Sequence, residues 1–195
     1  MKERIGELVG KAAEKIWMGT FHSILARILR NEAKRIDYQP NFSIYDREDS
    51  VSLVSNTLQA LNINLDNYSA SAVQHRISSL KNQMIYPTEY AKHLASTIIE
   101  RKIAEVYIEH NKRLKENNSM DFDDLLLKPT ELFNNHPRVL QKYRSQFKYI
   151  LVDEYQYTNP LQNEIFKILV DNTGNGSSFF VVGDDYQSIY GFTGA

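Results

Sequence analysis

Residues 150–159 read Ile-Leu-Val-Asp-Glu-Tyr-Gln-Tyr-Thr-Asn, and this stretch decides which fold to expect. Its apolar beginning, together with Tyr149, is typical of a buried strand in a parallel sheet. The strand would end on Asp153 and Glu154, at the edge where open α/β sheets bind their ligands. One of two such carboxylates can hold Mg²⁺ while the other orients a water molecule for attack on a phosphate. A strand that simply ends in solvated acids explains so short a motif about as well. Other motifs must therefore decide between these two interpretations.

Two other stretches repeat the pattern of an apolar run followed by polar residues. Residues 179–185 read Phe-Phe-Val-Val-Gly-Asp-Asp, and residues 15–23 read Lys-Ile-Trp-Met-Gly-Thr-Phe-His-Ser. Helical patterns separate the three runs, which indicates an α/β core that handles nucleotides. We therefore predict strands at about Ile16–Thr20, Lys148–Asp153 and Phe179–Val182, and we expect them to pair in parallel.

The middle of the chain carries helical patterns. Apolar residues recur there at spacings of three and four, which predicts a helical block from about Asp46 to Asn117 with a core of its own. Asp46 and Thr88 are the expected N-caps of two of its helices. Further on, Pro129 lies inside an apparent helix. Because proline removes a backbone donor, a break or kink is expected near Leu127-Lys128.

Four ordered motifs resemble those of one protein family. Residues 19–23 resemble its motif Ib, and residues 120–126 resemble the segment that returns from its inserted domain. Residues 152–156 resemble its motif II, the Walker B element, and residues 182–191 its motif III. Because four ordered motifs rarely agree by chance, the chain is identified as similar to the UvrD/PcrA/Rep class of superfamily 1 DNA helicases.

The resemblance implies an α/β fold with a partial RecA-like parallel sheet, of the P-loop NTPase type, and an inserted all-helical subdomain. Residues 1–37 and 118–195 would form part of motor domain 1A, and residues 38–117 would form domain 1B. No Gly-x-x-x-x-Gly-Lys-Ser/Thr motif occurs, so this sequence has no P-loop to cradle phosphates. We therefore expect an internal piece of a longer helicase, inactive as an ATPase by itself.

The resemblance also implies roles in ATP hydrolysis. Asp153 would hold Mg²⁺ against the phosphates of ATP, and Glu154 would orient and deprotonate the attacking water. Gln187 would sense the γ-phosphate, since a neutral amide can both donate and accept hydrogen bonds. ATP and Mg²⁺ are therefore the expected cofactors.

Five residues are the expected DNA contacts, and four of them have a plainer alternative. Thr20 and His22 would touch the DNA backbone, although without the resemblance His22 is better explained as a locally bonded residue at a helix start. Lys81 is explained equally well by a phosphate contact and by a solvated surface charge. Tyr190 and Phe192 would stack on single-stranded bases, at about 1–3 kcal/mol per base, or would lie in the core.

The implied function is that of an ATP-dependent DNA helicase, a 3′-to-5′ translocase acting on single-stranded DNA and on single/double-strand junctions, in DNA repair or replication. Tyr157, Tyr186 and Thr193 depart from the family pattern, and each removes a charge near the active site. These departures put the coupling between hydrolysis and translocation in doubt. They keep open a second hypothesis, a non-catalytic relative that uses the fold to bind DNA or a partner protein.

Composition sets wider bounds. Hydrophobic residues at 42% and charged residues at 24% are typical of a folded globular chain. No apolar run could span a bilayer and no leader precedes a cleavage site, so a cytoplasmic protein is expected. The absence of cysteine excludes disulfides and thiolate metal sites. The net charge is −1, but residues 1–36 hold eight Lys and Arg against four Glu, a basic excess that could meet phosphates or simply be solvated.

Overall fold

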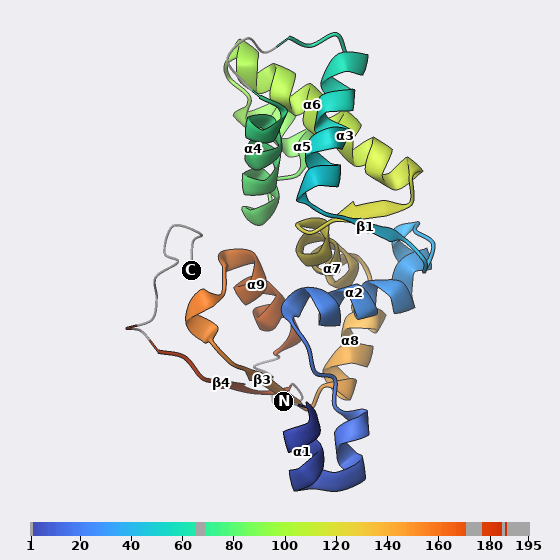
Figure 1. Cartoon of the computed structure of the whole chain (residues 1–195), viewed down its shortest axis with the longest axis vertical. Coiled ribbons are helices and arrows are strands. Elements are labelled where there is room, and N and C mark those ends of the chain that lie inside the picture. The colour runs from blue at the N-terminus through green and yellow to red at the C-terminus, as the bar shows by residue number, and fades with distance from the viewer. Residues whose placement is uncertain (1, 65–68, 171–176, 185, 187–195) are drawn as a thin grey trace.

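The computed structural model describes residues 2–64, 69–170, 177–184 and 186. Helices predominate in these residues, and two small parallel sheets lie among them (Figure 1). The described part begins with α1 (Lys2–Val9) and the 3-10 helix η1 (Gly10–Lys15), at the bottom of Figure 1. None of the described helices has the length and apolar character that a membrane crossing requires.

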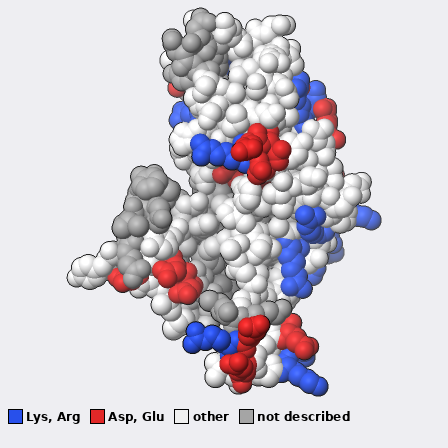
Figure 2. All heavy atoms as spheres, viewed as in Figure 1, with Lys and Arg blue, Asp and Glu red and all other residues white. Residues whose placement is uncertain are grey.

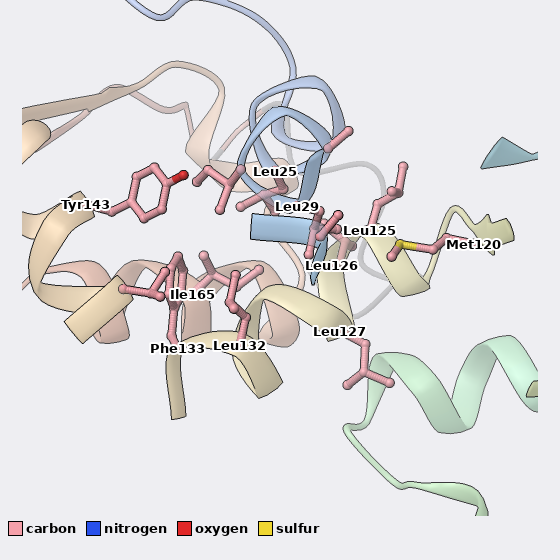
Figure 3. Packing of buried hydrophobic residues seen from close by; sticks show 14 of the residues in the cluster. Leu25, Leu29, Met120, Leu125, Leu126, Leu127, Leu132, Phe133, Tyr143 and Ile165 are labelled. Carbon is pink, nitrogen blue, oxygen red and sulfur yellow. The ribbon is translucent and has the colours of Figure 1, made fainter. Parts of the chain in front are cut away.

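The first hydrophobic core is built mainly by four helices. They are α2 (Phe21–Glu32), which continues into η2 (Ala33–Ile36), α7 (Asp124–Asn135), α8 (Pro137–Gln146) and α9 (Pro160–Leu169). Each presents apolar residues at helical spacing to the shared interior. Figure 3 shows Leu25 and Leu29 of α2 against Leu125 and Leu126 of α7, with Tyr143 of α8 nearby.

A second hydrophobic core lies within a separate group of helices. The group consists of α3 (Arg47–Ala60), α4 (Ala70–Asn82), α5 (Pro87–Glu89), the π-helix η3 (Tyr90–Leu94) and α6 (Ile98–Glu116), at the top of Figure 1. Its core includes Val54, Ile77 and Tyr107. The predicted helical block is therefore confirmed, and so is the cap at Asp46, which forms a capping box with Asp49.

Two predictions about individual helices are wrong. The long helix α6 is capped by Thr97 and not introduced by Thr88, because Thr97 and Glu100 form a capping box. Helix α7 is one helix through Pro129, so the predicted break is wrong, and the alternative of a kink stays a prediction. Buried leucines on both sides of Pro129 pack into the first core, and this packing outweighs the loss of one backbone hydrogen bond.

One parallel sheet confirms two predicted strands. Strand β3 (Tyr149–Val152) pairs with β4 (Ser178–Val181), with Val152 opposite Val181. The strand predicted at Ile16–Thr20 is wrong, because this segment is an irregular connection between η1 and α2. Its apolar character has another cause: the ring of Trp17 packs edge-on against Tyr143 and Phe147.

A second parallel sheet was not predicted. Strand β1 (Ser43–Tyr45) pairs with β2 (Ser119–Asp121). The chain therefore passes from β1 into the helices of the second core and returns from them on β2. The backbone N–H of Ser43 donates to the carbonyl of Asn118 at 3.1 Å, which holds the two ends together. Strands of three residues are too short to show a period-two pattern in the sequence.

Candidate functional site

The carboxylates of Asp153 and Glu154 are exposed at the carboxyl end of β3. Figure 2 shows acidic side chains gathered where β3 and β4 end. Glu154 has a left-handed backbone, with φ 54° and ψ 43°, which non-glycine residues adopt rarely and often at functional sites. Its N–H donates to Oδ1 of Asp153 at 3.0 Å. The turn therefore brings both acids to the same edge of the sheet.

The side chain of Gln156 connects Glu154 to the end of β4. Its Nε2 donates to Oε2 of Glu154 at 2.6 Å, and its Oε1 accepts from the backbone N–H of Asp184 at 3.0 Å. A Cβ atom at Gly183 would lie 2.8 Å from that Oε1, so the glycine leaves room for the amide. From the sequence, Gln156 was predicted only as part of a motif, and its contact with Glu154 was not predicted. Its position two residues after Glu154 was the available signal.

The turn after Glu154 is anchored through Tyr155. The backbone N–H of Tyr155 donates to the carbonyl of Val182 at 2.9 Å. Its hydroxyl donates to Oδ1 of Asn163 at 2.8 Å, and its ring contacts Phe166 and Phe179. The 3-10 turn η4 (Tyr155–Tyr157) is thereby fixed to both α9 and β4.

The predicted phosphate sensor and base platform cannot be placed. Gln187, Tyr190 and Phe192 lie outside the described residues, so their roles stay predictions. Thr193, a departure from the family pattern, lies outside them as well. Tyr186, another departure, is 99% exposed, so no packing role accounts for it.

The exposed acids suit a magnesium ion that is shared with a phosphate. Within the described ranges, no cluster of three or more His, Asp or Glu side chains could hold a metal by itself. Mg²⁺, however, is usually held by one or two carboxylates together with water and phosphate oxygens. The exposed oxygens of Asp153 and Glu154 fit such a ligand set.

The predicted DNA contacts of motif Ib lie at the start of α2. Thr20 is its exposed N-cap, and its Oγ1 accepts from the N–H of Ser23 at 3.3 Å. His22 is half-buried, and its ring packs edge-on against Phe122 at 5.5 Å between centroids. Burial lowers the pKa of His22, which favours the neutral imidazole.

Phe122 is a candidate that sequence reasoning missed. Its side chain is 50% exposed although it is aromatic, and the fold places it beside His22, a hundred residues earlier in the chain. The segment 121–124 reads Asp-Phe-Asp-Asp, so one apolar ring stands among three acids. That pattern was the available signal for an exposed ring.

The two predicted roles of Lys81, a phosphate contact and a solvated surface charge, are both wrong. Its side chain is fully buried, and Nζ lies 2.7 Å from Oδ2 of Asp121 and 2.9 Å from Oδ1 of Asp124. Burial alone would lower the pKa of Lys81, but the two carboxylates outweigh burial and raise it above its usual value. Lys81 lies one helical turn after the buried Ile77, on the inward face of α4. It therefore joins α4 to β2 and α7 and cannot reach DNA.

The comparisons with known proteins cover the whole chain. Residues 1–195 match the family described as the UvrD/REP helicase N-terminal domain. The chain is 40% identical over 195 residues to the ATP-dependent DNA helicase PcrA of Bacillus subtilis (strain 168). It is 42% identical over 195 residues to the protein of the same name from Staphylococcus aureus (strain Mu50 / ATCC 700699). Each alignment covers 100% of this chain and 26% of the relative, so the chain spans about a quarter of the length of these curated relatives. The match over residues 1–195 shows that the chain belongs to the UvrD/REP helicase family.

Proposed function

We propose that this chain is part of an ATP-dependent DNA helicase, in which it supplies the carboxylate that activates water and part of the DNA-binding surface. One observation carries the proposal: the two exposed acids end a parallel strand, and Gln156 fixes Glu154 against the end of the next strand. Relatives that are 40–42% identical carry the name ATP-dependent DNA helicase, which supports the same activity.

On the ATP side, Glu154 is the proposed general base. Its carboxylate is exposed and held by Gln156, so it can accept a proton from a water molecule aligned with a phosphate. Asp153 would hold Mg²⁺, which when bound neutralises charge on the phosphates of ATP. Gln187 is the proposed sensor of the γ-phosphate, on the basis of the motif alone.

On the DNA side, the proposed contacts are Thr20, His22, Phe122, Tyr190 and Phe192. The half-exposed ring of Phe122, braced by the imidazole of His22, is suited to stacking on an unpaired base. Single-stranded DNA and its junctions with duplex are therefore the proposed substrates, with translocation from 3′ to 5′ as in the family. Repair or replication, in the cytoplasm of a bacterial cell, is the proposed setting.

We further propose that residues 1–37 and 118–195 belong to a RecA-like motor domain and that residues 38–117 are inserted into it. The pairing of β1 with β2 brings the two ends of the insertion together, and each part has its own core. Tyr38 and Phe42 pack into the first core. Judged by its packing, the insertion therefore begins near β1 and not at residue 38. Tyr149 and Leu151 are 74% and 73% exposed on one face of β3, as expected for a sheet that other segments complete.

A second candidate function is a non-catalytic relative that binds DNA or a partner protein. The uncharged Tyr157, Tyr186 and Thr193 favour this alternative. Either way, we expect the 195-residue chain alone not to hydrolyse ATP, because its sequence has no P-loop.

Glu154→Gln in the complete protein that carries this chain tests the proposal. The substitution keeps shape and polarity but removes the base, so the hydrolysis rate should fall by about 10²–10⁴-fold while ATP affinity changes little. Glu116→Gln, at an exposed acid on α6, is the matched control and should behave as wild type. Equal loss of binding and turnover would assign Glu154 a structural or metal-holding role, and a wild-type protein without ATPase activity would favour the second candidate.

A further inference from the structure

Asn82, the last residue of α4, binds three partners through one side-chain amide. Its Nδ2 donates to the carbonyl of Ser78 at 2.9 Å and to Oδ1 of Asp123 at 2.8 Å. Its Oδ1 accepts from Nδ2 of Asn159 at 3.1 Å. Asp123 precedes α7 and Asn159 precedes α9, so this amide joins three parts of the fold that are far apart in sequence.

On one side, the link leads to the exposed ring of Phe122. The carboxylates of Asp121 and Asp124 are bound to Lys81, and that of Asp123 is bound to Asn82. Burial, together with the charge of Asp121, raises the pKa of Asp123, while hydrogen bonds from Ser78 and Asn82 oppose that rise. The end of α4 therefore holds all three acids of the segment and leaves Phe122 exposed beside His22.

On the other side, the link leads to the turn that carries Glu154. Oδ1 of Asn159 accepts from the N–H of Gln162 at 2.8 Å, and Oε1 of Gln162 accepts from the N–H of Asn159 at 3.0 Å. This capping box fixes the start of α9 to Asn159. The hydroxyl of Thr158 donates to the carbonyl of Tyr155 at 2.7 Å, so hydrogen bonds continue back to the residue that follows Glu154.

We propose that Asn82 is a positioning residue that couples DNA contact at Phe122 to hydrolysis at Glu154, an inference that rests on the proposed function. A base stacked on Phe122 shifts the segment containing Asp123. Asn82 passes that shift to Asn159, and the cap of α9 passes it to the turn after Glu154. Asn82 itself touches neither the phosphates nor the DNA.

Two variants of the complete protein remove the link in different ways. Asn82→Ala removes the whole amide. Asn159→Asp keeps the oxygen that caps α9, so the helix start is preserved. It removes the N–H group that donates a hydrogen bond to Oδ1 of Asn82. Gln83→Ala is the matched control, because Gln83 is an exposed neighbouring amide whose side chain donates to Oγ of Ser79 in α4.

The measurements are ATP hydrolysis with and without saturating single-stranded DNA, DNA affinity, and urea unfolding. Each variant should reduce the stimulation by DNA at least about fivefold, with the rate in the absence of DNA within about twofold of wild type. The double variant should lose no more than either single variant, because both remove the same link. Gln83→Ala should retain full stimulation.

Three outcomes would overturn the coupling role: full stimulation in Asn82→Ala, multiplied losses in the double variant, or equal losses with and without DNA. The last would show that Asn82 only supports the fold. A wild-type protein that hydrolyses ATP without any response to DNA would instead overturn the proposed function, and with it the coupling. The measurement on the wild-type protein therefore distinguishes failure of the coupling role from failure of the proposed function.

Discussion

The side-chain amide of Gln156 donates a hydrogen bond of 2.6 Å to the carboxylate of Glu154, whose backbone is in the left-handed region. The oxygen of the same amide accepts from the backbone N–H of Asp184 at 3.0 Å. The proposed base is therefore held by a residue that depends on the end of β4. Its position is set by the pairing of two strands and not by the local turn alone.

Gly183→Ala should displace this amide in the complete protein. The added Cβ would lie 2.8 Å from Oε1 of Gln156, so the end of this side chain must shift, which disturbs its hydrogen bond to Glu154. We expect the hydrolysis rate to fall by about 10- to 100-fold with a smaller change in ATP affinity, as for a misplaced catalytic group. Steady-state ATPase assays measure both, and Gly6→Ala is the control because no atom lies within 4 Å of its added Cβ. Undiminished turnover would show that Gln156 does not position Glu154.

Phe122→Ala should weaken binding of single-stranded DNA by about 1–3 kcal/mol, with little dependence on base sequence. Phe122→Leu retains apolar bulk against His22 but removes the aromatic face, so it should lose nearly as much affinity. Titration of labelled oligonucleotides at two salt concentrations measures the change. Wild-type affinity in Phe122→Leu would show that the ring acts by packing alone.

Lys81→Met should destabilise the chain by about 3–5 kcal/mol, because it leaves the carboxylates of Asp121 and Asp124 buried without their cation. Lys115→Met removes a cation that pairs with Asp37 at the surface, and it should change stability by less than about 1 kcal/mol. Urea unfolding followed by circular dichroism compares the two. Similar small changes in both variants would contradict the buried site of Lys81.

Stability should decrease as the pH falls from about 6.5 towards 4. The pKa of His110 is lowered from 6.5 to about 4, mainly by burial and secondly by the charge of Lys81. The charges of Asp121 and Asp124 oppose this shift. The unfolded chain therefore binds a proton in this window that the folded chain does not, and roughly 3 kcal/mol of stability is lost across it. His110→Gln should flatten this part of the pH profile of urea unfolding. His75→Gln, at an exposed histidine, should leave the profile unchanged.

Leu151→Lys tests whether other segments extend the sheet. Because Leu151 is 73% exposed here, the substitution should change the stability of the 195-residue chain by less than about 0.5 kcal/mol. In the complete protein the same charge would be buried under neighbouring structure, and folding or activity should be lost. Ser145→Lys, at an exposed position on α8, should be tolerated in both. A fully active Leu151→Lys protein would contradict the proposed RecA-like sheet.

Features that depend on neighbours in sequence could be predicted. The strands at β3 and β4, the helical block and the cap at Asp46 follow from periodicity and from capping chemistry, which act over a few residues. The acids that end β3 were found for the same reason. The strand wrongly predicted at Ile16–Thr20 shows the limit, because an apolar run does not reveal whether a sheet or aromatic rings will bury it.

The sequence by itself therefore determined the family, the helical block and the carboxylate pair. Only the tertiary structure decided which polar side chains meet. It buried Lys81 between two acids, placed Phe122 beside His22, and joined Asn82 to Asn159. The partners in these contacts are between 40 and 100 residues apart in the chain. Whether a charge is solvated or paired depends on the groups that packing brings to it, and no local pattern encodes that neighbourhood.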